Sequence, residues 1–388
     1  MEIREIRPEE REAAFYVGSQ AFMQGGRDMS FLDHPDKLAR RTFGIWDEGG
    51  LQAMAGVLDY RIQLGTAPAA RMGGVAAVAC LPASRGKGYA ADCLRYTLER
   101  MREEGQSVSV LHPFSFEFYD RLGWAWVGVQ RTYEVRTRAL KPAPETESVR
   151  AATQADRAAI VAAYTEFSRR YRGPIARCEK HWNTVLNSSD KEYRYTYVYE
   201  RSGHVEGYLT YMGGKRESTR LRELVALTPA ARRGLLGLLR RHEMQIDQFV
   251  WTAPADDGLW STLMHWDTQT RLQPVAQGRI VDLPAAIAAW QPDAQAEGSV
   301  AIEVLDVNAP WNAGRWRLEF GGGSARAERT GAEPQVALDI RELSQAYFGT
   351  PSLAELHRED AIDVRDATGF ASLAALLEGP PMWMNDPF

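Results

Sequence analysis

Apolar and polar positions change their period several times along the first 140 residues. The two-residue alternation of β-strands covers 2–7, 41–46, 52–63, 71–80, 108–111 and 126–135. Helical spacing fills the intervals at 8–40, 90–104 and 116–122. Strands interleaved with helices in this order predict a mixed sheet with helices on both faces, which is an α/β architecture.

The same pattern begins again after a polar, proline-bearing linker at 141–147. Strand-like alternation returns at 193–200, 205–212, 300–305 and 315–320. Helical spacing follows Ala155 and Pro229 and later covers 340–346 and 370–377. The chain is therefore predicted to fold as two tandem mixed-sheet α/β domains, 1–140 and 146–284, followed by an α+β domain, 285–388.

Composition narrows the possible classes of protein. A chain of 388 residues with 45% hydrophobic content is too long for one core, and its net charge of −5 argues against a nucleic-acid partner. The three cysteines have no C-x-x-C spacing and the seven histidines no i, i+4 pair, so we expect neither disulfides nor a metal site. The N-terminus resembles no signal peptide and no run of about 18 apolar residues occurs. We expect a cytoplasmic protein without a membrane span.

A turn rich in glycine and basic residues, 82–90, lies between a β-prone run and a helix. Gly86 and Gly88 lack the Cβ atoms that hold a ligand away, so backbone N–H groups at the helix start can point at phosphate oxygens. Arg85 and Lys87 add positive charge. Neither the Rossmann nor the P-loop glycine spacing is present. On these residues alone, an anion cradle and a simple β-to-α turn both remain open.

An incomplete copy of this turn occurs at 221–236, where a strand, Pro229, two arginines and a helix follow in the same order. Only Gly234 corresponds to the two glycines of the first copy. We expect the second copy to have lost cofactor binding, because close backbone approach to a pyrophosphate needs both positions.

A second motif, 111–124, follows the strand at 108–111. It predicts a helix of one to two turns that carries Tyr119 and is terminated by Gly123 as a C-cap. A structural tyrosine buried with a satisfied hydroxyl is one interpretation, and a proton donor is the other.

The whole chain resembles the Eis (enhanced intracellular survival) family of GCN5-related N-acetyltransferases. The resemblance rests on Arg85-x-x-Gly88-x-Ala90, on Phe118-Tyr119-x-x-Leu122-Gly123-Trp124, on the copy near Pro229 and on a terminal phenylalanine. It implies two GNAT-like domains, the second degenerate, and a last domain similar to sterol carrier proteins. It also implies acetyl coenzyme A (acetyl-CoA) as cosubstrate, no metal, an amine acceptor and a homo-oligomer, with a hexamer as the family's assembly.

The resemblance assigns roles to particular residues. Cofactor binding is implied for Val78, Cys80, Arg85, Gly86, Lys87, Gly88, Tyr89, Ala90 and Ser115, with the strand at 78–80 bonding the pantetheine arm. Tyr119 would face the thioester sulfur and protonate the departing thiolate, whose conjugate acid has a pKa near ~8.5. The α-carboxylate of Phe388 would accept the proton of the amine.

The chemistry and the tail composition favour this role for Phe388 independently. A primary amine is almost wholly ammonium at neutral pH and must lose a proton before it attacks a thioester. The tail at 380–388 is apolar and rich in proline, which indicates a buried terminus although chain ends normally fray. Pro387 stands where some relatives have an acidic residue, so Asp386 is the remaining source of a second negative charge.

The acceptor is the least specified part of the prediction. Asp28, Asp33 and Glu117 could form an acidic pocket for an aminoglycoside- or polyamine-like cation, and solvated carboxylates in loops are the plainer interpretation. Two other functions remain open, a lipid-binding carrier and a protein lysine acetyltransferase. We predict an N-acetyltransferase acting on a small cationic amine.

Overall fold

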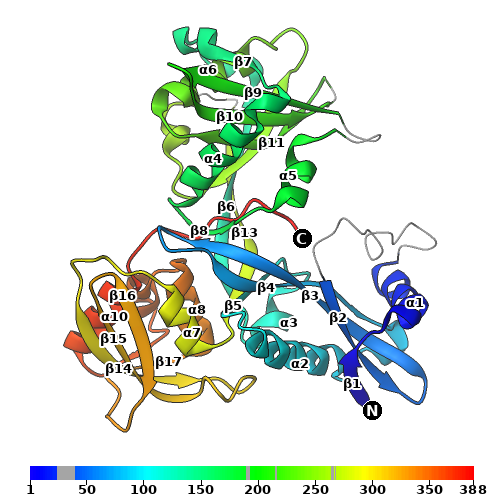
Figure 1. The fold of residues 1–388 in the computed structure, drawn as a ribbon, viewed down its shortest axis with the longest axis vertical. Coiled ribbons are helices and arrows are strands. Elements are labelled where there is room, and N and C mark those ends of the chain that lie inside the picture. Colours follow the sequence, from blue (N-terminus) through cyan, green and yellow to red (C-terminus); the bar gives the residue numbers. More distant parts are fainter. Residues whose placement is uncertain (24–39, 189–192, 215, 264–265, 267) are drawn as a thin grey trace. The chain divides into compact units, whose positions relative to one another are not determined.

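The computed structural model describes residues 1–23, 40–188, 193–214, 216–263, 266 and 268–388 (Figure 1). The described chain forms two compact units. One combines 1–127, 275–379 and 387–388, and the other combines 128–274 and 380–386. Each unit is therefore assembled from segments that are distant in sequence.

The N-terminal part of the first unit is a mixed sheet in the order β1-β2-β3-β4-β5-β13. Its strands are β1 Glu2–Glu5, β2 Arg40–Asp47, β3 Gly50–Leu64, β4 Ala70–Cys80, β5 Val108–Leu111 and β13 Gln269–Ile280. Neighbours are antiparallel except β4 and β5, which run parallel with Met72 opposite Val108. Two further helices and a strand, α2 Tyr89–Glu103, α3 Phe116–Asp120 and β6 Ala125–Arg136, complete this part of the chain.

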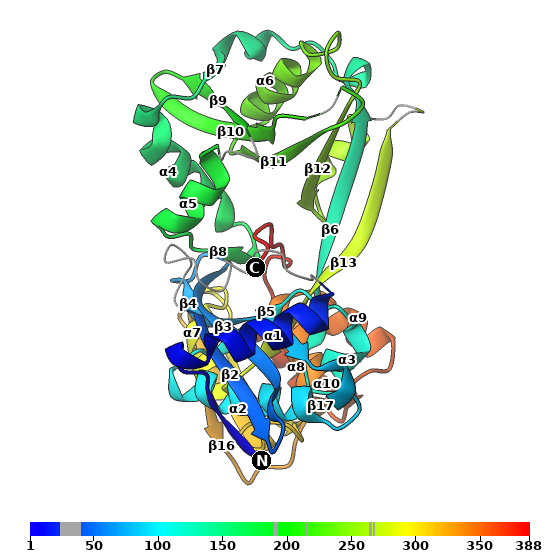
Figure 2. The ribbon, with the colours of Figure 1, turned by 90° about the vertical axis from the view of Figure 1, so that its right-hand side faces the viewer.

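Helices α1 (Arg11–Phe22) and α2 cover opposite faces of this sheet, and Figure 2 shows α1 lying across its strands. The alternation of β3 explains the arrangement, because successive side chains of a strand point to opposite faces. Ala53 and Ala55 pack in the cluster that contains Leu98 of α2, whereas Met54 packs with Val17 of α1. Since both faces are covered, β3 is apolar almost continuously along this stretch.

The C-terminal part of the first unit is an α+β layer. Its sheet has the order β16-β15-β14-β17-β18. The strands are β14 Gly298–Leu305, β15 Gly314–Gly321, β16 Ser324–Arg329, β17 Val336–Asp339 and β18 Asp363–Val364. The helices are α7 Leu283–Ala289, α8 Ile340–Phe348, α9 Leu353–Arg358 and α10 Ala367–Leu377.

The second unit repeats the plan of the first sheet, in the order β6-β12-β11-β10-β9-β7. Its remaining elements are β7 Val149–Ala151, α4 Arg157–Ser168, β8 Arg172–Ile175, α5 Glu179–Leu186, β9 Arg194–Arg201, β10 His204–Met212, β11 Thr219–Ala226, α6 Pro229–Arg240 and β12 Gln248–Pro254. Again a single neighbouring pair is parallel, β11 and β12, with Thr219 opposite Phe249. Tyr208 packs with α4 and Leu209 with α6, so the two faces of β10 are separately buried.

Most of the predicted elements are confirmed, and the differences have physical reasons. The helical pattern at 8–40 includes α1, while 24–39 lies outside the described residues. The expected linker contains a 3-10 turn, Pro144–Ser148, in which Glu145 accepts a hydrogen bond from Arg233 at 2.6 Å. Strands β12 and β13 went unpredicted because one is buried almost throughout and the other is exposed and then buried, so neither alternates. The other short 3-10 turns are Pro8–Glu10, Pro82–Ser84, Thr137–Ala139, Gln154–Asp156 and Gly258–Ser261.

Candidate active site

The glycine-rich turn joins β4 to α2 and leaves the start of that helix open. Gly86 and Gly88 have φ angles of +81° and +87°, a region that favours glycine over residues with a side chain. Gly88 is the N-cap residue of α2, and no side chain caps the first turn there. The first N–H groups of α2 are therefore available to an anion, and the helix dipole favours negative charge at this end.

Strand β4 also offers a backbone edge beside this turn. β5 pairs with β4 only from Met72 to Val75. The register of β3 with β4 shifts near Ala77, which has a positive φ of +52°, as in a β-bulge. The edge of 76–80 that faces away from β3 therefore has no partner from β5 and can accept an extended amide-bearing ligand.

A cleft of about 660 Å³ brings these features together. Its lining comprises Ala21, Phe22, Val78, Ala79, Cys80, Ser84, Arg85, Gly86, Gly88, Tyr89, Ala90, Ala91, Phe114 and Phe118. Seven of the predicted cofactor residues are among them: Val78, Cys80, Arg85, Gly86, Gly88, Tyr89 and Ala90. A largely apolar wall with an arginine and a helix start at one end suits a phosphate-bearing ligand with a long apolar arm.

The two remaining predicted cofactor residues lie outside the lining. Lys87 places its Nζ 5.8 Å from the ring centre of Tyr89. Ser115 is the N-cap of α3, where its Oγ accepts a hydrogen bond from the backbone N–H of Phe118 at 3.3 Å. The Tyr89 hydroxyl donates to Asp47 at 2.9 Å, a contact the sequence did not suggest.

Tyr119 lies on α3 and is 3% exposed. Its ring contacts those of Phe114, Phe118 and Trp124, with centroid separations of 5.3, 5.0 and 6.5 Å. Burial raises the pKa of the phenol, so the group stays protonated throughout the neutral range. No hydrogen-bond partner among the described residues occupies the hydroxyl, which is the state required of a proton donor.

Two residues of the C-terminal α+β layer and one residue of β13 hold the end of α3, through three contacts that the sequence did not reveal. Arg341 donates to Asp120 at 3.1 Å, Asn308 donates to the carbonyl of Arg121 at 3.0 Å, and Arg279 donates to the carbonyl of Leu122. The next residue is Gly123, where a Cβ atom would overlap the Arg279 guanidinium. The C-cap of α3 is Arg121 and not the predicted Gly123, which lies in the turn beyond the helix with a φ of +87°.

Arg279 is fully buried and is itself fixed by an ion pair. Its Nη2 lies 2.7 and 2.6 Å from the two carboxylate oxygens of Asp306, which is 4% exposed. Because Nη2 is held by both oxygens of Asp306, Nη1 remains to donate to the carbonyl of Leu122 at the end of α3. Asp306 and Arg341 are distant from Tyr119 in sequence and carry no local motif, so only the fold could reveal them.

Phe388 packs on the sheet of the first unit. Its ring centre lies 5.0 Å from that of Tyr60 on β3 and 5.1 Å from that of His112, which follows β5. A Cβ atom on Gly74 would come within 3.1 Å of the Phe388 ring, so this glycine allows the close approach. The adjoining tail is buried as predicted, with Met382, Trp383 and Met384 each at most 3% exposed.

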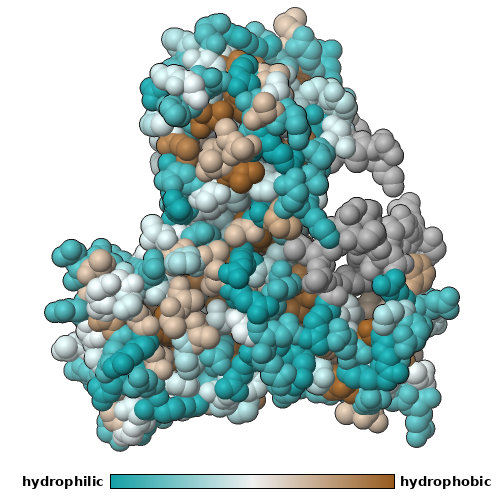
Figure 3. Space-filling model, viewed as in Figure 1, coloured by the Kyte–Doolittle hydropathy of each residue, from teal (hydrophilic) through white to brown (hydrophobic). Residues whose placement is uncertain are grey.

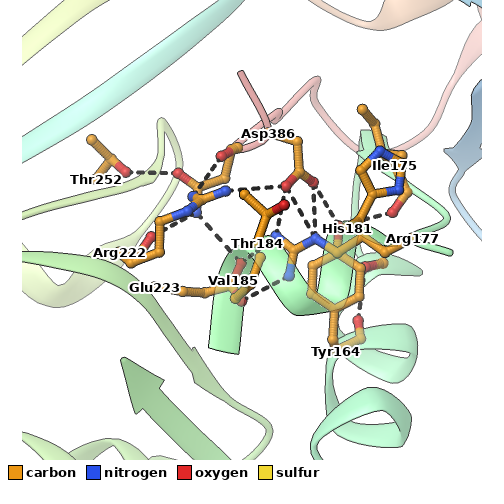
Figure 4. Close-up of polar contacts among 12 residues, drawn as sticks. Tyr164, Ile175, Arg177, His181, Thr184, Val185, Arg222, Glu223, Thr252 and Asp386 are labelled. Atoms are coloured by element: carbon orange, nitrogen blue, oxygen red, sulfur yellow. Dashed lines mark hydrogen bonds and ion pairs between the residues drawn. The ribbon is translucent and has the colours of Figure 1, made fainter. Parts of the chain in front are cut away.

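The acidic residues expected at the acceptor site are not gathered in one described pocket. Asp28 and Asp33 lie outside the described residues, and Glu117 is exposed on the first turn of α3. Asp386 is 6% exposed in the second unit, where it is paired with Arg177 and Arg222 (Figure 4). These contacts give no support for a direct role of Asp386 in substrate binding.

Comparison with known proteins defines the class of the chain. Residues 2–127 and 173–280 each match a family model described as an acetyltransferase (GNAT) domain, and 283–385 match the sterol carrier protein domain. The predicted order of two GNAT domains followed by a sterol-carrier-like domain is confirmed. The protein is an acyltransferase of GNAT type, a class that uses acetyl-CoA.

Individual relatives agree with this class. The chain is 27% identical over 336 residues to an uncharacterized N-acetyltransferase of Streptomyces avermitilis, with 81% of each chain covered. It is 28% identical over 388 residues to an uncharacterized N-acetyltransferase of Streptomyces coelicolor, with 92% of each covered.

Solved structures share the fold across the full chain. A GCN5-related N-acetyltransferase from Anabaena variabilis has a TM-score of 0.90 at 21% identity, and Eis1 from Mycobacterium abscessus has 0.80 at 22%, each with 100% of both chains covered. No helix within the described ranges is long and apolar enough to cross a membrane. Among the same residues, no group of three His, Cys, Asp or Glu side chains is placed to hold a metal ion.

Proposed function

We propose that this protein transfers the acetyl group of acetyl-CoA to an amine of a small cationic molecule, as an Eis-like acetyltransferase. The observation that carries the proposal is the cleft at the β4–α2 turn, in which the open start of α2 and the unpaired edge of 76–80 line one cavity. The pyrophosphate would lie at the helix start near Arg85 and Gly88, and the pantetheine arm would bond along Val78 to Cys80.

The reaction in this proposal is a direct attack. The carboxylate of Phe388 accepts a proton from the ammonium, and the neutral amine forms a bond to the thioester carbon. The carbon–sulfur bond then breaks as the Tyr119 phenol gives its proton to the thiolate sulfur. The nitrogen releases its second proton to solvent, from which Tyr119 regains one, and the Phe388 carboxyl returns its proton to solvent. The buried, protonated state of Tyr119 supports its role as the acid.

The position of Phe388 supports its role as the base. Its ring is packed on β3 and β4 of the unit that contains the cleft, and the segment that carries Tyr119 begins at His112, which the same ring contacts. The tail is buried at 382–384 and again at Asp386 and is held in place there, whereas Pro387 is exposed and Phe388 is half-buried. A carboxylate that is fixed in this way can act on a bound amine at the cost of little further ordering.

A thiol-release assay tests the proposal. Acetyl-CoA is offered with polyamines, an aminoglycoside and lysine-containing peptides in parallel, and fatty-acid binding is measured separately. We expect acetyl-CoA-dependent thiol release with the small cationic amines. Turnover with peptides alone would indicate a protein lysine acetyltransferase, and no turnover together with tight fatty-acid binding would indicate a lipid carrier.

We also propose a cytoplasmic homo-oligomer, with a hexamer as the expected form. The face shown in Figure 3 is mostly hydrophilic, but the second unit exposes six large apolar residues in its described part: Tyr193, Tyr195, Met244, Trp260, Trp266 and Leu272. The proposal rests on the family resemblance, and these side chains offer apolar surface that a subunit contact would cover. Light scattering coupled to gel filtration measures the mass directly, and a monomer at micromolar concentration would contradict the proposal.

A further inference from the structure

We propose that the degenerate central domain holds the C-terminal tail through a buried ionic network, and that Asp386 and Arg177 are positioning residues for Phe388. The inference rests on the proposed role of the Phe388 carboxylate. It assigns a function to a domain that has lost its own cofactor site, and it concerns charged groups that the acetyl transfer itself does not use.

The centre of the network is Arg177, whose side chain is wholly buried (Figure 4). Its Nη1 and Nη2 donate to the two oxygens of Glu223 at 2.9 and 2.6 Å. Its Nε lies 3.1 Å from each carboxylate oxygen of Asp386. One guanidinium therefore links β11, which carries Glu223, to the last residues of the chain.

Further groups complete the pairing of charges. Arg222 donates to Asp386 at 3.3 Å and to the carbonyl of Asn385 at 2.9 Å. The Tyr208 hydroxyl donates to Glu223 at 2.5 Å. Two arginines thus face two carboxylates, so the buried cluster is formally neutral.

The ion pairs outweigh the cost of burial. Burial alone would raise the pKa of Glu223, but the Arg177 guanidinium holds that pKa below its ordinary value. Both partners therefore stay charged, and the removal of one charge would leave the buried cluster with an unbalanced charge. Asp386 supplies one of its two negative charges.

The same domain holds the tail upstream of Asp386 by backbone and ring contacts. The N–H of Arg172 donates to the carbonyl of Pro381 at 3.1 Å, and the N–H of Trp383 donates to the carbonyl of Arg172 at 2.7 Å. The Trp383 ring lies 5.5 Å from those of Phe167 and Tyr171. These contacts bury the tail and fix its register at 381–383, whereas the ionic network fixes Asp386, which is closer to Phe388.

The ionic network calls for an explanation, because a tail with apolar side chains at these positions would be buried just as well. Replacing buried ion pairs by apolar side chains is often neutral for stability, and their best-attested use is to select one register. Asp386 is two residues from Phe388, and Pro387 between them fixes one backbone angle and restricts the residue before it. A slip of one residue at Asp386 would move Phe388 by about 3.8 Å.

The test compares Asp386→Asn with a matched control, Asp156→Asn. Asp156 is 8% exposed and forms a bidentate pair with Arg150 at 2.7 and 2.8 Å, in the same domain and without contact to the tail. We expect Asp386→Asn to lower kcat about 10- to 100-fold, as misplacement of a reacting group does, with the KM for acetyl-CoA within twofold. Asp156→Asn should leave both constants unchanged.

Two further measurements separate positioning from loss of fold. Asn385→Ala removes the contacts of that side chain with Thr252 and Arg222 but keeps every charge, and it should lower kcat less than Asp386→Asn. Hydrogen exchange of the amides of 382–386 should speed up in Asp386→Asn and not in Asp156→Asn.

Deletion of Phe388 distinguishes the two levels of the proposal. If that deletion lowers kcat while Asp386→Asn and Arg177→Met keep wild-type kcat and tail exchange, the positioning role is overturned and the proposed base stands. If the deletion itself leaves kcat unchanged, the base is overturned, and the positioning role falls with it.

Discussion

The two GNAT domains have the same sheet plan but differ where the sheet meets the helix. In the first, Leu81–Gly88 separate β4 from α2, which is eight residues, whereas in the second only Leu227 and Thr228 separate β11 from α6. The first turn carries the glycines and basic residues, and the second is too short for either. The difference in turn length lies outside the sheet, which keeps the same plan in both domains.

The starts of the two helices also differ, because the N–H groups of the first turn are uncapped in α2 and capped in α6. Gly88 leaves the first turn of α2 uncapped, but Thr228 accepts a hydrogen bond from the N–H of Ala231 at 3.1 Å and Pro229 has no N–H at all. The corresponding cavity is about 190 Å³, against 660 Å³ in the first domain. A capped helix start beside a small cavity provides few free N–H groups and little space for a pyrophosphate.

Gly234 looked from the sequence like a remnant of the cofactor turn, and the structure gives it another use. It lies inside α6, where a Cβ atom would come within 2.8 Å of the Glu145 carbonyl and of the Tyr199 ring. The glycine serves close packing. A single glycine after a proline and arginines is therefore poor support for a nucleotide site.

The largest expected effect comes from removal of the Tyr119 hydroxyl, the proposed proton donor of the first domain. Tyr119→Phe should lower kcat by about 10²–10³, the usual contribution of a proton donor, with the KM for acetyl-CoA little changed. Steady-state kinetics measure both. Tyr199→Phe, a buried tyrosine of the second domain, is the control and should retain wild-type kcat; equal losses in the two variants would erase the proposed difference between the domains.

The second test replaces Gly88 and Gly234 by valine in turn and compares the effects on coenzyme binding and on stability. Gly88→Val places a β-branched residue at a φ of +87° and should weaken coenzyme A binding about tenfold, through a backbone cost of roughly 1–2 kcal/mol. Gly234→Val should lower Tm and leave the Kd unchanged. Calorimetry gives Kd and stoichiometry, and we expect one coenzyme per chain; two sites would contradict the degenerate status of the second domain.

A smaller effect is expected from the support of α3. Arg341→Met removes the contact with Asp120, which is partly exposed, and should lower kcat about threefold, in keeping with ~0.2–1 kcal/mol for such a pair. Arg326→Met breaks an exposed pair with Glu319 in the same layer and should have no effect on kcat. An identical small loss in both variants would point to general destabilisation.

The last prediction is that kcat does not fall in the moderately alkaline range. Burial raises the pKa of Tyr119, so the phenol keeps its proton below its ordinary pKa of about 10 and loses it only above that value. Because this acid keeps its proton, kcat should show no alkaline decline up to about pH 10. An alkaline decline centred near pH 8 that disappears in Tyr119→Phe would contradict a raised pKa.

The sequence predicted local features better than distant ones, for a physical reason. The turn at 82–90 and the helix with Tyr119 depend on neighbours in sequence, through glycine conformation, capping and period, so their patterns are readable. Arg177 and Asp386 lie 209 residues apart, and nothing in either neighbourhood indicates the other. The tail composition did predict burial, because an apolar, proline-rich segment has little reason to be solvated.

The acceptor site was the part least accessible to prediction. Asp28 belongs to the stretch outside the described residues, and Glu117 is a single exposed carboxylate. The supports of α3 were equally hidden, since Arg279 and Asp306 have no motif and act only once the α+β layer has folded against the first sheet. The glycine turn at 82–90 could be predicted because it depends on local backbone geometry. The pair of Arg279 and Asp306 could not, because it depends on the tertiary fold.

The contact between Arg341 and Asp120 has a consequence for the timing of synthesis. The two residues are 221 positions apart, so a ribosome that adds ~5–20 residues per second makes them roughly 10–45 s apart. The glycine turn and α2 can form early, but the contact of Arg341 with Asp120 on α3 can form only in the final third of translation. The support that this contact gives to α3 is therefore acquired late, long after the segment that carries Tyr119 has been synthesised.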